Sequence, residues 1–409
     1  MPLWKYTQKP DKRPYAGFRF PIRLLREVFS MSSKSRIVWI ALCGSVAGLT
    51  LCALGLGGAA RATDKPATTW SAEAAEHYLD GRETWWQGWD RAKKDRGTLC
   101  VSCHTQATYG LARPVLRERL GEREISPQEQ TMLASIEKRV RDWSVMQPFY
   151  SDVVSGAGKE VESRNAESVL NAVILASYDA GKQDLSQRTR IAFDNAWALQ
   201  TKTGPDAGSW VWQNFDYSPW EAKESQYHWA ALMAVAVGKA PGDYREDKMV
   251  AENLRLLTEY LRSHYDTQPL VNKIVALWAE KYFPGVMTFD QERELVERVN
   301  GLQQADGGWS LTDLGTWKRR DNTPLETRSD GYATGLIVLV SEETGAGQRL
   351  GIAHLLAGVR WLEANQDKTT GAWPAWSVNK NRDVTTPVGQ FMSDAATSYA
   401  VLALEDAKK

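Results

Sequence analysis

The sequence predicts an all-helical fold made of repeated helix pairs, and three observations support this prediction. First, the chain contains three segments in which a glutamine is followed, after a few residues, by glycine and then tryptophan: residues 200–210, 303–309 and 366–373. Second, each segment follows an amphipathic stretch and precedes a stretch rich in alanine and aliphatic residues. Third, the chain has 18 tryptophans, which suggests a repeated structural role or an aromatic-lined cavity. A stretch that is apolar on nearly all sides is typical of a buried helix.

Each repeat is therefore predicted to consist of an outer helix, a turn and an inner helix. The amphipathic outer stretches are RIAFDNAWAL, ELVERVNGL and AHLLAGVRWLEA. The apolar inner stretches begin at Tyr227, Gly331 and Ala395. Two further helices without the tryptophan signal are expected near residues 168 and 270. Because Trp309 follows Trp210 by 99 residues but precedes Trp373 by only 64, a weakened repeat is expected between the first two turns.

The turn LQQADGGW at residues 302–309 resembles the Q-x-x-D-G-x-W turn of the prenyltransferase and squalene-cyclase repeat family. The resemblance covers roughly residues 160–405. It implies an α/α toroid, an incomplete double helical barrel of squalene-cyclase-like repeats whose inner helices surround a cavity. Members of the family cyclise or transfer isoprenoids, and related toroids have other roles.

The catalytic motifs of that family are absent from this sequence. There is no Asp-x-Asp-Asp run of the kind with which cyclases protonate an alkene, and no Asp-Asp-x-x-Asp diphosphate site. No cysteine follows Cys103, whereas protein prenyltransferases bind zinc through Asp, Cys and His. The resemblance therefore implies the fold more strongly than the activity.

The N-terminal part of the sequence, residues 1–62, is predicted to be a basic extension followed by a signal peptide or membrane anchor. Residues 37–60 carry no charge, follow Lys34 and Arg36, and end in a small-x-small site that predicts cleavage after Ala62. An uncleaved anchor is the alternative, because 24 such residues can span a bilayer. Met31 begins a second stretch that resembles the start of a signal peptide. The mature chain is thus expected to be periplasmic or secreted, or held at the membrane by this segment.

Residues 63–155 are predicted to form a helical haem-binding region ahead of the toroid at 156–409. Cys100, Cys103 and His104 make the C-x-x-C-H pattern of c-type haem attachment. The two thiols add to the porphyrin vinyl groups and the histidine ligates the iron, so one covalent haem c is the expected cofactor. A redox dithiol or a structural disulfide is the alternative, and zinc has less support because no fourth ligand is evident.

The second axial iron ligand is not fixed by the sequence. Met146 is the favoured candidate, since Met ligates iron in many small electron-transfer cytochromes. Met132, a histidine or an open position are the alternatives, and most methionines simply fill protein cores.

Polar residues at the starts of the inner helices are candidates for a site in the toroid, because these helix starts are expected to meet at one mouth. Asp330 and Asp394 could serve as general acids, with Arg328 and His228 beside them. Helix capping is the alternative for both aspartates, and a core histidine with satisfied hydrogen bonds is the alternative for His228. An open cavity lined by Trp and Tyr is expected between the inner helices.

Charge excludes one class of partner. The 50 basic and 50 acidic residues give a formal net charge of +0. The chain therefore has no excess of basic residues to pair with the phosphates of a nucleic acid. The expected function is haem-dependent redox or electron transfer, with a redox partner protein or an apolar small molecule as partner. An isoprenoid-type enzyme without the usual acid, and a non-catalytic binding module, are the alternatives.

Overall fold

The computed structural model describes residues 70–407, so the predicted N-terminal extension and signal peptide or anchor lie outside the described residues. The fold in this range is helical, apart from a hairpin of two-residue strands, β1 (Lys93–Lys94) and β2 (Thr98–Leu99). Within residues 70–407, none of the helices combines the length and the apolar composition needed to cross a bilayer.

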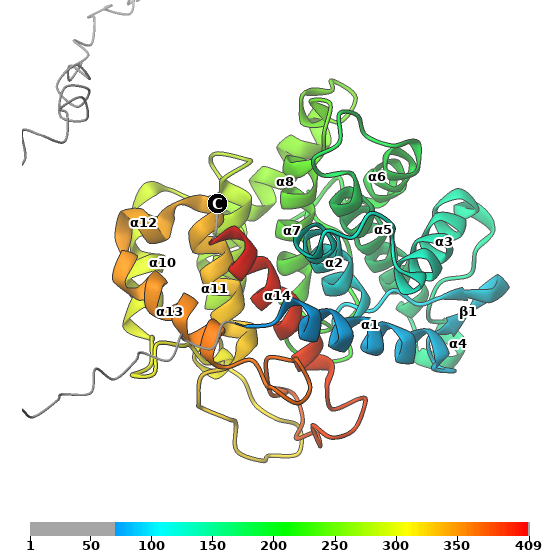
Figure 1. Ribbon diagram of the computed structural model, residues 1–409. Coiled ribbons are helices and arrows are strands. Elements are labelled where there is room, and N and C mark those ends of the chain that lie inside the picture. Colours follow the sequence, from blue (N-terminus) through cyan, green and yellow to red (C-terminus); the bar gives the residue numbers. More distant parts are fainter. Residues whose placement is uncertain (1–69, 408–409) are drawn as a thin grey trace, which may run out of the picture. The chain divides into compact units, whose positions relative to one another are not determined.

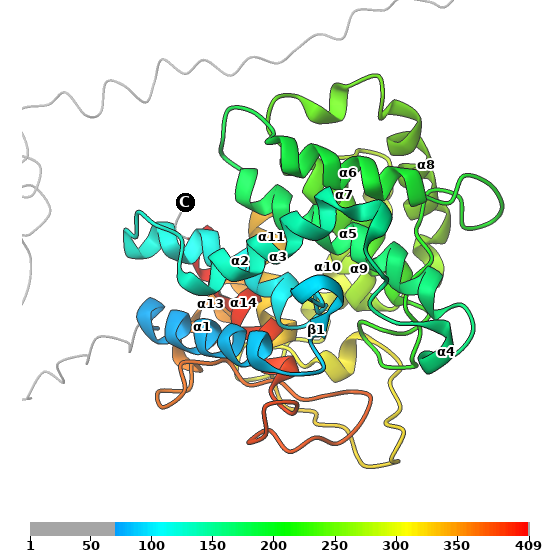
Figure 2. The same ribbon diagram turned by 90° about the vertical axis from the view of Figure 1, so that its right-hand side faces the viewer.

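Six inner helices form a closed ring (Figures 1 and 2). In chain order they are α2 (Gln106–Leu120), α5 (Lys159–Asp179), α7 (Ser225–Lys239), α9 (Leu270–Glu280), α11 (Gly331–Thr344) and α14 (Phe391–Asp406). Each packs against the next, and α14 packs against α2, which closes the ring. The predicted inner helices are thus confirmed, including the two without a tryptophan signal.

An outer helix precedes each inner helix in the chain and packs on the ring. The outer helices are α1 (Ala72–Gly88), α3 (Pro127–Arg141), α6 (Gln187–Leu199), α8 (Ala251–His264), α10 (Phe289–Gly301) and α13 (Ile352–Ala364). The short helices α4 (Asp152–Ser155) and α12 (Ala346–Leu350) lie in connections. Six such pairs make an all-α toroid, as the sequence predicts.

The three Gln-Gly-Trp turns share one hydrogen-bond pattern. The indole N–H of Trp210, Trp309 and Trp373 donates to a carbonyl of the preceding outer helix, at 2.7, 2.7 and 2.8 Å. The glutamine amide of each turn donates twice, to the carbonyl of the turn glycine and to a carbonyl at the next outer helix. Each turn therefore joins one outer helix to the next by buried polar contacts.

The turn glycines are required by both conformation and space. Gly208, Gly307 and Gly371 have φ of 103°, 93° and 82°. A Cβ on Gly208 or Gly371 would lie 2.0 or 2.1 Å from a backbone oxygen of the next outer helix, Leu256 or Ala74. Only glycine allows this backbone conformation and this approach together.

The N-terminal helices belong to the same ring as the repeats. Helix α2 supplies the inner position between α14 and α5, and α1 packs on α14 and α2. The described residues 70–407 accordingly belong to one compact unit. The predicted haem-binding region at 63–155 therefore contributes helices to the toroid.

All inner helices run in the same direction, so their N-terminal loops gather at one end of the ring, here called the mouth. The loops before α11 and α14 lie side by side there (Figures 1 and 2), joined by the Arg320 N–H bond to the Asn379 carbonyl at 2.9 Å. Within the ring, Trp229, Tyr332 and Tyr399 are at most 2% exposed. At the ends of the helices away from the mouth lies a small apolar pocket of about 90 Å³, lined by residues of α2, α5, α7, α9 and α14.

Candidate functional site

The C-x-x-C-H segment lines a pocket of about 280 Å³ at the mouth of the toroid. Cys100, Cys103 and His104 form part of its wall. Aromatic side chains make much of the remainder: Trp86, Trp89, Tyr150, Tyr217, Trp220 and Phe391. The aromatic-lined cavity thus lies at the mouth, and most of its rings come from loops and α1 instead of the inner helices.

Local hydrogen bonds hold the cysteine segment in place. The Cys100 N–H donates to the Ala92 carbonyl at 2.7 Å, beside the β1–β2 hairpin. The Trp86 indole donates to the Cys100 carbonyl at 2.9 Å. The Ser102 hydroxyl accepts from the Gln106 N–H at 3.0 Å at the start of α2. These bonds fix the backbone that carries both thiols.

The two thiols are buried and are not joined to each other in a disulfide. Burial raises the pKa of Cys100 to about 12 and raises the pKa of Cys103 well above its usual value. Both groups are therefore protonated thiols at neutral pH, and neither has the depressed pKa of a catalytic or redox-active thiolate.

His104 is oriented by a hydrogen bond to its neighbour in sequence. Its Nδ1 lies 2.9 Å from the Thr105 Oγ1, and that hydroxyl donates to Oδ2 of Asp394 at 2.6 Å. Because the hydroxyl proton is used by Asp394, Nδ1 carries the proton and donates to Thr105. The lone pair of Nε2 is left available, which is the state of a metal-ligating histidine.

The surroundings of His104 keep the ring neutral. Burial, and then the charges of Arg82 and Arg382, lower its pKa to about 3. Phe391 stacks on the imidazole with ring centroids 3.7 Å apart, and Trp86 meets it edge-on at 5.4 Å. Aromatic rings thus pack around the imidazole, which lines the pocket wall.

Asp394 accepts four hydrogen bonds in a buried cluster. Arg82 donates from Nε at 2.6 Å and from Nη2 at 3.0 Å, Tyr78 at 2.8 Å and Thr105 at 2.6 Å. Burial raises the pKa of Asp394, and the Arg82 guanidinium and the hydroxyl donors oppose this rise. The N-cap of α14 is Gln390, so Asp394 is not the helix cap. Its oxygens are engaged by α1 and by the residue after His104.

Asp330 has the geometry of a helix cap. Its side chain accepts from the Ala333 N–H at 2.8 Å, and it also accepts from the Leu311 N–H at 2.6 Å. Burial raises the pKa of this carboxyl to about 7, although the backbone donors act in the opposite direction. The contacts of Asp330 account for both of its oxygens without a substrate.

Arg328 and His228 lie in different environments. The Arg328 side chain is 65% exposed, stacks over Trp376 at 4.2 Å and pairs with Glu326 at 3.3 Å. His228 is fully buried, with Nδ1 3.3 Å from the Asn272 Oδ1, and burial lowers its pKa to about 4. The structure therefore does not bring Arg328, His228, Asp330 and Asp394 together around one space.

Sequence reasoning missed several side chains of the pocket of about 280 Å³ that Cys100, Cys103 and His104 line, called the His104 pocket from here on. Met392 lines it, whereas Met146 is buried in the loop before α5 and is not among the lining residues. Glu221, Arg91 and Arg382 also line it, and burial raises the pKa of Glu221 to about 7. Met392 stands at the start of an inner helix, so the expectation that helix starts meet at the mouth could have identified it.

Comparison with known proteins does not assign the chain to a family. No protein-family model and no curated protein matches the chain. One solved structure, titled "UGL_D88N/dGlcA-Glc-Rha-Glc", is similar at 12% identity with a TM-score of 0.47, over 81% of this chain and 95% of that one.

In the described range 70–407 there is no group of three or more His, Cys, Asp or Glu residues that could hold a metal ion on its own.

Proposed function

We propose that this protein is an exported c-type haem protein that transfers electrons. One haem would be attached through Cys100 and Cys103, with His104 as an iron ligand. The observation that carries this proposal is the orientation of His104, whose Nδ1 is committed to Thr105 and whose Nε2 is free at the pocket wall. A haem c is attached through two cysteine sulfur atoms and its iron is bound by a histidine nitrogen, and this segment of five residues offers all three groups.

The other residues of the pocket also suit a haem. Six aromatic side chains offer apolar surface for a flat macrocycle. Arg91 and Arg382 at the same wall can pair with the carboxylates that a haem carries. Both cysteines are free of a disulfide, so their sulfur atoms are available for thioether bonds, and burial keeps His104 neutral as ligation requires.

A bound haem would supply a one-electron redox centre, and the chain's own residues would set its surroundings. Thr105 and Asp394 would hold the imidazole in one tautomer and orientation, which increases its strength as a ligand. The aromatic wall would exclude water from one side. Met392 lines the same pocket and would offer its thioether sulfur to the iron.

The toroid acts in this proposal as a scaffold that presents the haem at its mouth. The isoprenoid-type enzyme has less support, because its candidate residues are separated and Asp330 and Asp394 are engaged by other groups. We infer descent from the prenyltransferase and squalene-cyclase repeat family on the Gln-Gly-Trp turns alone. The proposal that the protein is exported is supported by the N-terminal apolar segment and by the fact that c-type haem is attached outside the cytoplasm.

The test is covalent haem in protein produced with the cytochrome c maturation machinery. Denaturing gels stained for haem peroxidase activity should show a band for the wild type, and its absorption spectrum should be that of a c-type haem. The band should be lost in the Cys100→Ser/Cys103→Ser variant.

The matched control is Cys43→Ser/Cys52→Ser, which removes the same number of thiols outside the haem pattern and should keep the band if the precursor is exported. Wild-type protein that is folded by circular dichroism but carries no haem would refute the proposal.

A further inference from the structure

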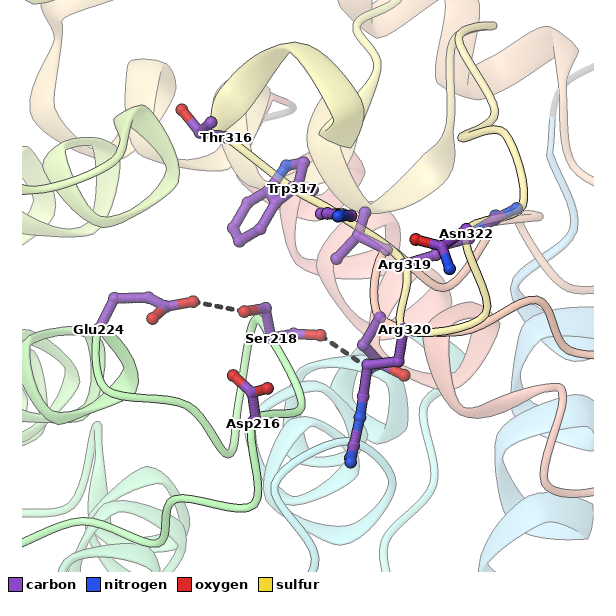
Figure 3. A pocket seen from close by; sticks show the side chains of 11 residues that line it. Asp216, Ser218, Glu224, Thr316, Trp317, Arg319, Arg320 and Asn322 are labelled. Atoms are coloured by element: carbon purple, nitrogen blue, oxygen red, sulfur yellow. Dashed lines mark hydrogen bonds between the residues drawn. The ribbon is translucent and has the colours of Figure 1, made fainter.

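A second and larger pocket, of about 550 Å³, lies at the mouth of the toroid (Figure 3). Three loops line it, the ones that precede α7, α11 and α14. Its lining residues fall into two groups that differ in charge. We call it the basic–acidic pocket.

One wall of the basic–acidic pocket is positive, with Lys318, Arg319 and Arg320 in succession. Arg319 is only 6% exposed, and its described hydrogen bonds run to backbone carbonyls, from Nε to Ser377 at 2.9 Å and from Nη1 to Pro324. Within residues 70–407, no carboxylate lies within ion-pair distance of it. Asp321, next but one in sequence, gives its oxygens to Thr323 and Asn381.

Arg319 and Asp321 interact electrostatically, but among residues 70–407 no carboxylate makes a hydrogen bond or ion pair with this buried guanidinium, and this favours an anionic ligand. Removing an arginine from water is costly unless a counter-charge compensates for it, and two carbonyls provide only part of that compensation. The planar fork of donors on arginine matches a carboxylate in particular. The positive wall therefore has the chemistry of an anion site.

The loop before α7 supplies the acidic residues, and the Arg320 guanidinium also reaches this loop, with Nη1 3.4 Å from the Phe215 carbonyl. Asp216 and Glu224 line the pocket, and Glu224 accepts a hydrogen bond from the Ser218 hydroxyl (Figure 3). Carboxylates accept hydrogen bonds from hydroxyl or amino groups, and they repel a second negative charge on a ligand. The ring of Trp317 also lines the pocket and is fixed by its indole N–H bond to the Leu311 carbonyl at 2.8 Å.

We propose that the basic–acidic pocket binds a small hydroxylated carboxylic acid. The carboxylate would pair with Arg319, assisted by Arg320 and Lys318, and the hydroxyl groups would donate to Asp216 and Glu224. A doubly charged phosphate fits less well, because Asp216 and Glu224 would repel it. This site goes beyond the proposed haem function and does not depend on it.

The ligand would lie next to the His104 pocket. Asn379 lines both pockets and donates to the Ser218 carbonyl at 2.8 Å. The ring of Tyr217, in the wall of the His104 pocket, has Arg320 at 5.1 Å and Arg382 at 6.0 Å from its centroid. One layer of side chains thus separates the two pockets.

Isothermal titration of the purified full chain tests the site with three probes: gluconate, sorbitol and inorganic phosphate. Gluconate and sorbitol are both polyols with six carbons, and only gluconate carries a carboxylate. We expect gluconate to bind at least about tenfold more tightly than either sorbitol or phosphate, since a charged hydrogen bond is worth roughly a factor of ten or more.

The Arg319→Gln variant should weaken gluconate binding by about tenfold or more. Because Arg319 also joins two loops, Arg320→Gln provides a second variant whose fold is not at risk, and it should weaken binding about threefold. The matched control is Arg328→Gln, an exposed arginine on the same loop but outside the pocket, which should bind as wild type.

Three results would overturn the proposal: no gluconate binding to the wild type, equal binding of sorbitol or phosphate, or the same loss in Arg328→Gln as in Arg319→Gln. The two proposals can fail separately. If the basic–acidic pocket does not depend on haem, the Cys100→Ser/Cys103→Ser variant should bind gluconate as tightly as the wild type does.

Discussion

The contacts between the tryptophan-marked repeats differ in kind from the contacts that join helix α1 to α14. Between repeats, glutamine and tryptophan side chains bond to backbone carbonyls, and the three turns use the same pattern. Between α1 and α14, the side chains of Arg82 and Tyr78 bond to the side chain of Asp394. Backbone carbonyls are present at every position, so the first kind of contact can be repeated with one sequence motif. The second kind depends on particular side chains, as the buried Arg139–Glu167 pair between α3 and α5 also does.

Helix α1 is held by both kinds of contact. On the side of α13, the Gln366 amide donates to the Ser71 carbonyl at 2.9 Å, as in the other turns, and the Ser71 N–H in addition donates to the Gln366 side chain at 2.7 Å. On the side of α14, the Asp394 cluster joins α1 and also fixes His104 through Thr105. The ring is thus completed by the general turn on one side and by a cluster linked to the candidate haem ligand on the other. The comparison shows that the turn contacts have the same form in each repeat and act only on the fold, whereas the Asp394 cluster also bonds to Thr105, the hydrogen-bond partner of His104.

The largest expected effect is on the repeats. Trp309→Ala should lower the free energy of unfolding by about 3–5 kcal/mol, because it removes a buried ring and its bond to the Val299 carbonyl. Chemical denaturation measures this change. Trp376→Ala, at a half-buried tryptophan outside the turns, should cost clearly less. An equal cost at both positions would show that the turn tryptophan has no special structural role.

The junction of α1 and α14 should be sensitive to charge. Asp394→Asn should cost about 2–3 kcal/mol of unfolding free energy, because it leaves the buried Arg82 without its counter-charge. Tyr78→Phe removes one neutral donor from the same carboxylate and should cost about 1 kcal/mol. If both variants unfold at the same denaturant concentration as wild type, the cluster does not hold the ring together.

The raised pKa of Asp330 predicts a pH effect on stability. Its folded pKa of about 7 lies above the ordinary value of 3.8, so between these values the folded state holds a proton that the unfolded state has lost. Stability from this residue is therefore present at low pH and decreases as the pH rises from about 4 to 7, by at most about 1.4 kcal/mol per pH unit. Asp330→Asn keeps a capping side chain and should make the curve of unfolding free energy against pH less steep. An unchanged slope would contradict the assignment.

The smallest effect is expected at Arg328. The Arg328→Ala variant should change the free energy of unfolding by no more than about 0.5 kcal/mol, because the side chain is exposed and its ion pair with Glu326 lies at the surface. Haem content should also be unchanged. A loss of more than about 1 kcal/mol would show that its stacking on Trp376 contributes more than a surface contact does.

Much of the fold could be predicted from the sequence because the determining interactions are local. Apolar periodicity identified the inner and outer helices of the repeats, and the Gln-Gly-Trp turns placed their connections. The bonds from Trp309 to Val299 and from Gln303 to Gly307 reach residues 10 and 4 positions away, and only the second bond of Gln303, to His354, spans 51 positions. The segment from Cys100 to His104 is likewise contained in five consecutive residues, so its spacing is visible without any structure.

The tertiary structure decided which distant residues meet. Arg82 and Asp394 are 312 residues apart, and no local pattern marks them as partners. Asp330 and Asp394 both stand near the start of an inner helix in the sequence. Asp330 is a helix cap, whereas Asp394 accepts hydrogen bonds from an arginine, a tyrosine and a threonine of other elements. Closure of the ring made this difference, because it placed α1 against α14, whereas the Asp330 side chain bonds to the first turn of its own helix and to the loop before it.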